Sequence, residues 1–349
     1  MLTKTLLIAL ILMGIFISCK KSSNSNNTNP GNIYVAGYNS GLAGYWKNNI
    51  FSVLNDSNNI AEVNSIRLSG SDIFTTGLKY QDTTEYAVYW KNHQVYHLTN
   101  GKIRGDGLSL AIQGSDIYVC GYEGSIAKYW KNGIGINLTD GKYMAWANSI
   151  KVLGKGIYIS GMENGVGKYW INGAAYTIPP VPGQYIGADM EIGANGVYLV
   201  GSVPDPTIKL PYNTGSWEPS LGTKAVYWLN GQIHYLEDGN YSAYATNIAI
   251  SGSDIYIVGM DNSGDLAHDV EGGTYFHSVI KLWKNGVPIS ITDGKWDAFV
   301  NSIMVSGKDI YLAGNELSSM GRKAIYWKNG TPTILANQGS GLTSIALGK

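Results

Sequence analysis

Short runs of apolar and aromatic residues recur along the chain at a regular interval. Each run begins with Ile or Val, continues with Tyr or Phe, and reaches a Gly at its fifth position. Apolar β-branched and aromatic residues in runs of this length predict β-strands. The seven runs are residues 33–37, 73–77, 117–121, 157–161, 197–201, 255–259 and 310–314.

A second motif follows every run. It contains a Trp, preceded by Tyr in six of the seven copies, with an Asn two residues later that is followed by Gly in five copies. Asn-Gly is the strongest short hairpin signal, because a type I′ turn needs positive φ at both central residues. The motif therefore predicts a strand, a tight turn and a further strand. Its tryptophans are Trp46, Trp90, Trp130, Trp170, Trp228, Trp283 and Trp327.

Another apolar strand precedes most runs, so the unit is predicted to be four antiparallel strands. The tryptophans recur at intervals of 40 to 58 residues, and four-stranded repeats near this length are typical of β-propellers. The sequence thus predicts an all-β, seven-bladed β-propeller over residues 33–349. Residues 342–348 have the pattern of a first strand, so the C-terminal strand is expected to complete the N-terminal blade and remove the open edges.

The N-terminal segment has a different pattern. Lys4 precedes a short apolar run over residues 6–17, which suits a signal peptide over residues 1–18 better than a membrane span. The sequence Ser-Cys-Lys-Lys at residues 18–21 resembles the lipobox of Bacteroidota lipoproteins. That resemblance implies a lipid on Cys19 and a membrane as partner, and Lys20 favours the outer membrane. An ordinary signal peptide with a chance cysteine is the alternative. Residues 19–32 are predicted to form a flexible tether.

The whole chain also carries a family resemblance. Its repeats lack the Gly-His and Trp-Asp pairing, the kelch double glycine and the sialidase Asp-box of common propellers. The lipobox together with the Tyr-Trp-Lys-Asn-Gly repeats is similar to a group of Bacteroidota β-propeller lipoproteins. The resemblance implies the fold and an envelope location, and it implies no catalytic residues.

Composition narrows the possible partners. The 349 residues include 25 Lys+Arg and 25 Asp+Glu, so the chain lacks the basic field that nucleic-acid binding needs. Hydrophobic residues make up 44% of the chain, which is enough to bury a core. If Cys19 carries lipid, Cys120 has no disulfide partner. Cys120 falls at a position occupied by small residues in the other repeats, so we expect it to serve packing rather than redox chemistry.

Two repeats contain long insertions between their second and third strands. From Tyr198 to Trp228 and from Tyr256 to Trp283 the separations are 30 and 27 residues, against 12 in three other copies. Both insertions are expected on the face where the connections into each first strand lie, and such loops commonly bind ligands. The fifth-repeat insertion is Pro-rich and contains Trp217, a candidate contact anchor. The acidic sixth-repeat insertion can offer oxygen ligands to Ca²⁺, but it lacks the EF-hand pattern, so no cofactor is expected.

The same face is predicted to differ between blades. Aligning the starts of the first strands places seven residues at one position: Gly341, Glu62, Asp106, Trp146, Ala188, Tyr244 and Phe299. Three residues earlier, the last four blades have Tyr143, Tyr185, Tyr241 and Trp296. We therefore expect a shallow cup at the channel mouth, with aromatic residues on blades four to seven and the carboxylates Glu62 and Asp106 on blades two and three. The alternative is that these aromatic residues only fill loop–blade contacts.

Aromatic faces with a few polar groups suit sugars, and they suit peptide segments as well. The chain has no Gly-x-Ser-x-Gly or His-Glu-x-x-His motif, and its five histidines are scattered. The preferred interpretation is a non-enzymatic, lipid-anchored envelope binding module for a glycan or a protein. Two alternatives stay open: a glycan-cleaving hydrolase or lyase that uses Glu62 and Asp106 as its carboxylate pair, and a protein–protein scaffold that uses the long loops.

Overall fold

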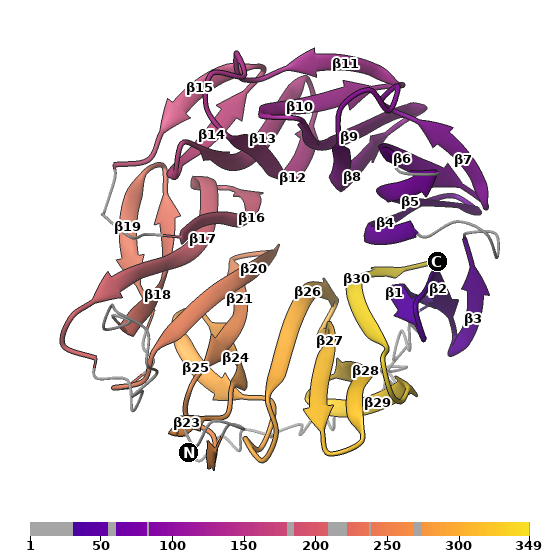
Figure 1. Ribbon diagram of the computed structural model, residues 1–349. Coiled ribbons are helices and arrows are strands. Elements are labelled where there is room, and N and C mark those ends of the chain that lie inside the picture. The colour runs from indigo at the N-terminus through magenta and orange to yellow at the C-terminus, as the bar shows by residue number, and fades with distance from the viewer. Residues whose placement is uncertain are drawn as a thin grey trace, which may run out of the picture.

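The computed structural model describes residues 31–54, 61–81, 84–179, 185–208, 222–236, 239–268 and 274–348, with only the backbone at 185–188 and 274. These residues form seven four-stranded antiparallel sheets and one two-stranded sheet. The seven sheets stand as blades around a central channel (Figure 1). The predicted seven-bladed β-propeller is therefore confirmed. Among the described residues, no helix is long and apolar enough to cross a membrane.

The innermost strand of each blade faces the channel (Figure 1). From blade 1 to blade 7 these strands are β30 (Gly341–Leu347), β4 (Ala61–Ser69), β8 (Gly105–Gln113), β12 (Ala145–Leu153), β16 (Tyr185–Gly193), β20 (Ala243–Ser251) and β26 (Ala298–Ser306).

The second strand of each blade contains the apolar run found in the sequence. In the same order these strands are β1 (Ile33–Asn39), β5 (Asp72–Gln81), β9 (Asp116–Glu123), β13 (Gly156–Glu163), β17 (Gly196–Asp205), β21 (Asp254–Asp261) and β27 (Asp309–Ser318).

The third and outermost strands form the hairpin that the Trp motif predicts. The third strands are β2 (Leu42–Lys47), β6 (Thr84–Lys91), β10 (Ile126–Lys131), β14 (Val166–Ile171), β18 (Gly222–Leu229), β24 (Val279–Lys284) and β28 (Gly321–Lys328). The outermost strands are β3 (Ile50–Val53), β7 (Gln94–His97), β11 (Ile134–Asn137), β15 (Ala174–Thr177), β19 (Gln232–Tyr235), β25 (Val287–Ser290) and β29 (Thr331–Ala336).

The repeated tryptophans form the core between blades. All seven are at most 2% exposed. Each lies in a cluster that joins two neighbouring blades; Trp283 of β24, for example, packs with Ala225 of β18 and Ala243 of β20. Because a buried Trp removes a large apolar area from water, these seven contacts hold the ring together.

The repeated Asn stabilises two turns at once. Asn132 has φ of 50°, which the turn after β10 requires, and its Oδ1 accepts a 2.9 Å hydrogen bond from the backbone N–H of Ile117. Its amide donates to Asp116 Oδ1, and Lys131 forms an ion pair with Asp116 Oδ2, both at 2.8 Å. The Lys-Asn part of the motif therefore ties the third-to-fourth turn to the start of the second strand.

The ring closes as the sequence predicts. Strand β30 pairs antiparallel with β1, with Ile33 opposite Leu347, and completes blade 1. The backbone N–H of Gly348 donates a 2.8 Å hydrogen bond to the carbonyl of Asn32. The two ends of the propeller domain therefore lie side by side (Figure 1).

The innermost strands contain a β-bulge near their middle. In β4, for example, the register shifts between Val63 and Ser65, so Asn64 is an extra residue opposite β5. The shift in β16 is longer, between Ile186 and Met190. Bulges re-aim side chains, and here they precede the residues that line the channel.

The blade 6 insertion contains a separate hairpin, β22 (Leu266–His268) and β23 (Thr274–Phe276), which pair with each other. In blade 5, β17 and β18 continue pairing to Asp205 and Gly222. Trp217 and Cys19, the residue expected to carry lipid, lie outside the described residues.

Candidate ligand-binding channel and its mouth

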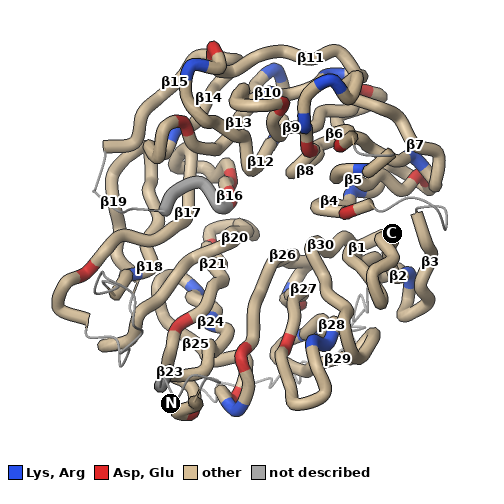
Figure 2. The backbone as a smooth tube through the Cα atoms, viewed as in Figure 1, with Lys and Arg blue, Asp and Glu red and all other residues tan. Residues whose placement is uncertain are grey.

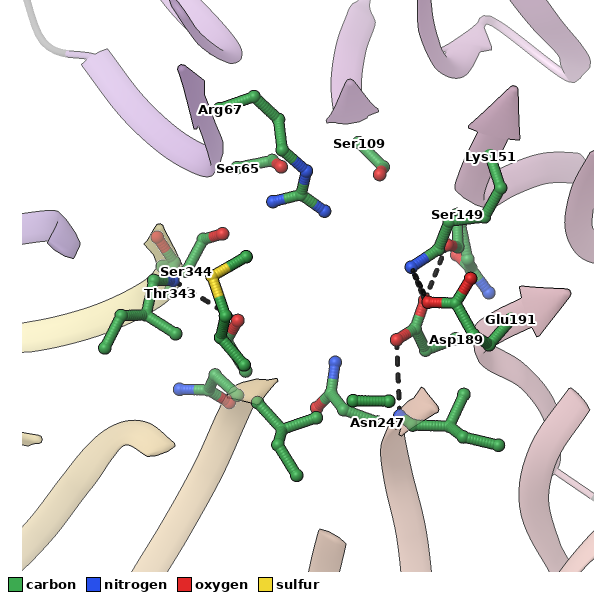
Figure 3. A pocket seen from close by; sticks show the side chains of 18 of the residues that line it. Ser65, Arg67, Ser109, Ser149, Lys151, Asp189, Glu191, Asn247, Thr343 and Ser344 are labelled. Atoms are coloured by element: carbon green, nitrogen blue, oxygen red, sulfur yellow. Dashed lines mark hydrogen bonds and ion pairs between the residues drawn. The ribbon is translucent and has the colours of Figure 1, made fainter. Parts of the chain in front are cut away.

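A cavity of about 350 Å³ occupies the central channel. In each innermost strand, the residue that directly follows the bulge is polar and lines this cavity (Figure 3). The seven strands are equivalent, so their side chains at this position all point the same way. These residues are Ser65, Ser109, Ser149, Asp189, Asn247, Ser302 and Ser344. The channel wall is therefore a ring of hydroxyl, amide and carboxylate groups.

Two residues further along each innermost strand, the blades differ strongly. This position lies opposite the motif aromatic and holds Arg67 in blade 2, Lys151 in blade 4 and Glu191 in blade 5. The other blades have Ala111, Ala249, Met304 and Ala346 there. At this position three blades thus carry charged side chains, in addition to Asp189, while the other four carry small or apolar ones.

Lys151 and the blade 5 carboxylates form one cluster. Lys151 Nζ lies 3.0 Å from Glu191 Oε2 and 3.9 Å from Asp189 Oδ1. Burial opposes the charge of Lys151, but Asp189 and Glu191 outweigh it and raise its pKa. Asp189 also accepts a 2.6 Å hydrogen bond from Ser149 and a 3.3 Å bond from the Ile248 N–H. This wall is internally satisfied and carries a net charge of −1.

Arg67 lies across the channel and points its guanidinium into the cavity (Figure 3). Its hydrogen bond within the described chain runs from NH1 to its neighbour's carbonyl, Ile66 O, at 2.7 Å. The ion pairs of the channel join Lys151 to Asp189 and Glu191 and leave Arg67 without a carboxylate within 4.0 Å among the described residues. Burial lowers the pKa of Arg67, while the charges of Asp189 and Glu191 act in the opposite direction.

Asp106 connects the channel with its mouth. It is 7% exposed and accepts a 2.9 Å hydrogen bond from the amide of Asn64, which borders the cavity. Burial raises the pKa of Asp106 to about 7, the bond from Asn64 opposes this, and Glu62 adds to it. A carboxyl group in this state exists in both protonation forms near neutral pH.

The carboxylates expected at the mouth are brought together. Glu62 is exposed on β4, close enough for its charge to act on Asp106. Glu85 of β6, which the sequence reasoning missed, belongs to the same group and forms an ion pair with Arg104. Blades 2 and 3 therefore present an acidic group with one cation beside it.

The predicted aromatic residues lie on the channel face that carries the long loops. Tyr143, Tyr241, Trp296 and Tyr244 are 44%, 43%, 39% and 37% exposed. Trp146 and Phe299 are half-buried. We call this set, together with Tyr185, the rim aromatics. Among those with described side chains, none borders the channel cavity, so the predicted cup that would unite the rim aromatics with the carboxylates stays a prediction.

The blade 6 insertion contacts the connection that leads into the innermost strand of blade 7. This confirms that these two loops lie on the same face of the ring. The backbone N–H of Ser278, after the blade 6 insertion, donates a 2.8 Å hydrogen bond to Asp297, just before β26. His277 lies with its Nδ1 3.3 Å from Asp297 Oδ2 and its ring 6.2 Å from that of Trp296. The scattered histidines of the sequence gave no sign of this contact.

One rim assignment is wrong. Tyr185 pairs with Ser202 next to Gly201, which is the register that Trp146 has opposite Met162 next to Gly161. Ala188, expected at that position, instead lies within the register shift of β16. The error arises because blade 5 has one more residue in its bulge than the other blades. Tyr185 is thus equivalent to Trp146, and not to Tyr143.

Two further sequence expectations concern metal and thiol chemistry. Asp261, the first acidic residue of the blade 6 insertion, is bound by Ser263 at 2.6 Å and by Lys281 at 3.1 Å. The described residues contain no group of three or more potential metal ligands. Cys120 is fully buried, its Sγ lies 3.4 Å from the carbonyl of Ala147, and burial raises the pKa of its thiol. Its expected packing role is confirmed.

The polar and charged lining of the channel was not anticipated, although the sequence contains a signal for it. Innermost strands of a propeller should alternate between core and channel. Ser65 and Arg67 in β4 and Ser149 and Lys151 in β12 have this spacing. Charged positions of both signs are otherwise spread around the whole ring (Figure 2), so charge alone does not single out these residues.

The chain has only low sequence identity to the known structures that it resembles. No family model and no curated protein matches the chain. It is similar to the computationally designed Ika8 protein, with 14% identity and a TM-score of 0.47 over 92% of this chain and 91% of that one. It is also similar to a chain of a nidogen/laminin complex, with 9% identity and a TM-score of 0.43 over 90% of this chain and 98% of that one.

A post-proline cleaving enzyme from Rickettsia typhi is also similar, with 11% identity and a TM-score of 0.45 over 88% of this chain. The chain spans about half the length of that enzyme, 52%. The assignment as a seven-bladed β-propeller rests on the protein's own strands.

Proposed function

We propose that the protein is a lipid-anchored binding module of the cell envelope, and that its loop face recognises a glycan. The observation that carries this proposal is the exposure of Tyr143, Tyr241, Tyr244 and Trp296, which are each between 37% and 44% exposed on the face where the long loops meet. Aromatic side chains that only filled loop contacts would be expected to lose nearly all of their accessible surface.

The chemistry of this face suits sugars. The exposed rings can pack against the C–H faces of a pyranose ring, an arrangement that needs no charge on the ligand. Trp146 and Phe299 are half-buried and can extend the same surface. The acidic group of Glu62 and Asp106 offers hydrogen-bond acceptors for hydroxyl groups. A neutral protein of this kind would bind through short-range contacts, with little long-range steering.

A glycan array with matched variants tests the proposal. Trp296→Ala and Tyr241→Ala should weaken each array signal at least tenfold. Tyr235→Ala is the control, because Tyr235 is 62% exposed on the outermost strand β19, away from the channel. A glycan signal unchanged in both rim variants, or the lack of any signal for the wild type, would rule the proposal out.

The anchor is tested separately. If Cys19 carries lipid, Cys19→Ala should move the protein from the outer-membrane fraction to the soluble fraction of the envelope. Retention of this variant in the membrane fraction would contradict lipid anchoring at Cys19, while leaving the glycan result unaffected.

The state of Asp106 favours a second candidate function, cleavage of a glycan. A buried carboxyl group with a pKa of about 7 can serve as a general acid, and the exposed Glu62 lies nearby as the second carboxyl group that such a reaction needs. In this case a polysaccharide would be turned over, with an activity that Glu62→Gln and Asp106→Asn each abolish. Binding without turnover would favour the binding module.

A further inference from the structure

We propose that the central channel is a separate binding site for a small hydroxylated monocarboxylate, the size of one uronic acid, whose carboxylate pairs with Arg67. The site lies deeper than the rim aromatics. Counting strand residues from Glu62 to Arg67, at about 3.3 Å each, puts Arg67 on the order of 15 Å below the rim. The proposal does not depend on the glycan function of the rim.

Arg67 supplies the charge that such a ligand needs. A guanidinium has five N–H donors in a planar fork that matches a carboxylate, and the described structure uses Arg67 in a bond to Ile66 O. The group faces a cavity rather than protein (Figure 3). A desolvated cation with unused donors is costly, and a bound carboxylate would satisfy both its charge and its geometry.

A second unsatisfied donor lies in the same wall. The amide nitrogen of Asn148 is buried, borders the cavity, and has no hydrogen-bond partner among the described residues. Buried polar groups in native proteins almost always have a partner, so the amide of Asn148 is a donor that a bound ligand can satisfy once the side chain turns toward the cavity. The hydroxyl groups of Ser65 and Ser109 lie beside Arg67 (Figure 3). Together these groups suit a ligand with several oxygen atoms.

The opposite wall restricts the charge of the ligand. Asp189 and Glu191 are occupied by Lys151 and by Ser149, so they do not neutralise Arg67 directly. With Lys151 they leave one net negative charge facing Arg67 across the channel. A dianion would be repelled by this wall, whereas a monocarboxylate can place its charged end at Arg67 and its hydroxyl groups toward the other side.

The size of the cavity points to a small ligand. Ligand pockets generally measure about 300–1,000 Å³, and the channel cavity of about 350 Å³ lies at the lower end. One sugar ring fits this space better than a chain does.

Calorimetry on the full-length protein in detergent tests the site with defined probes. D-glucuronate should bind to the wild type, while glucose and the neutral methyl ester of glucuronate should bind at least tenfold more weakly. Arg67→Gln should weaken glucuronate binding at least tenfold. Arg322→Gln is the charge-matched control, because Arg322 lies on an exposed part of β28 and donates to Tyr38. It should leave binding unchanged.

Several results would overturn the proposal: no glucuronate binding by the wild type, equal binding of acid and ester, or full binding by a folded Arg67→Gln protein. Should Arg67→Gln fail to fold, NMR of the wild type decides. Glucuronate must shift the side-chain amide signals of Asn148 and Asn64, and signals that stay in place exclude the channel as the site. Trp296→Ala should not change glucuronate binding, which keeps this result separate from the rim.

Discussion

The amide of Asn64 donates a 2.9 Å hydrogen bond to the carboxyl group of Asp106, joining β4 of blade 2 to β8 of blade 3. The same amide reaches the carbonyl of Gly107 at 3.1 Å. Because Asn64 also borders the cavity, this contact links the acidic group at the mouth to the channel wall. We therefore expect protonation of Asp106 to affect both the acidic group at the mouth and the channel wall next to Asn64.

Asp106 should make the protein less stable at high pH. Its pKa of about 7 in the folded state exceeds the ordinary value of 3.8, so the folded state binds more protons between pH 4 and 7. Stability therefore falls as the pH rises through this window. Asp106→Asn can still accept the Asn64 bond and should raise the free energy of unfolding at pH 8 by up to about 4 kcal/mol.

Urea unfolding of both proteins at pH 5 and pH 8 measures this effect. Asp265→Asn serves as the control and should change little, since Asp265 is exposed in the blade 6 insertion and is not among the groups that act on Asp106. If Asp106→Asn kept the wild-type difference in stability between the two pH values, the burial argument for Asp106 would be wrong.

We expect the repeated turn asparagine to stabilise the folded protein through both its backbone conformation and its side-chain hydrogen bonds. Asn285 has φ of 52° and bonds to the Ile255 N–H at 2.8 Å and to Asp254 at 2.9 Å. Asn285→Ala loses the two bonds and strains the backbone, for about 2 kcal/mol in total. Asn285→Gly loses the bonds alone and should cost less. Denaturant melts of the two variants compare them, and equal losses would argue against the backbone contribution.

Two tryptophans in neighbouring blades should lose very different amounts of stability on truncation. Trp283 is fully buried between blades 5 and 6, so Trp283→Ala should cost about 3–5 kcal/mol of stability. Trp296 is 39% exposed, and Trp296→Ala should cost less than about 1 kcal/mol. Thermal unfolding followed by circular dichroism measures both. A large loss for Trp296→Ala would mean that this rim residue is structural, which would weaken the glycan proposal.

Cys120 should be inert in the folded protein. Its Sγ is fully buried and burial raises the pKa of the thiol, so little thiolate is available and reagents cannot reach it. A maleimide should label Cys120 at least 100-fold more slowly in buffer than in 6 M guanidinium chloride, as followed by mass spectrometry of a Cys19→Ala protein. Comparable labelling rates would place the thiol at an accessible surface.

The blades and their closure were predictable because the signals for them are local and repeated. A turn such as the one at Asn132, or a buried Trp such as Trp283, occurs once in every blade. A repeat with a weaker motif can therefore be assigned by alignment with the other repeats. The position of Ala188 was mispredicted for the opposite reason. One extra residue inside the bulge of β16 leaves the hydrophobic pattern intact, and only the pairing with β17 reveals the shift.

The site was less predictable, because its properties depend on contacts between blades. Nothing in the residues around Asp106 indicates that Asn64, 42 positions earlier, covers it. The sequence around Arg67 likewise does not indicate that Arg67 lacks an ion-pair partner among the described residues. That property arises because Lys151 pairs with the carboxylates of blade 5. The period-two spacing of Ser65 and Arg67 indicated which side of β4 they share, but not that this side encloses a cavity.

The pairing of β1 with β30 also sets the order in which the molecule can be completed. Blade 1 begins at Ile33 and receives its innermost strand only when Gly341–Leu347 arrives, so a growing chain keeps an open ring until this segment is available. Until then β1 exposes unpaired backbone groups to other chains. Closure of the ring thus waits for β30, and a product truncated within Gly341–Leu347 would be exposed to aggregation or proteolysis, although six blades were intact.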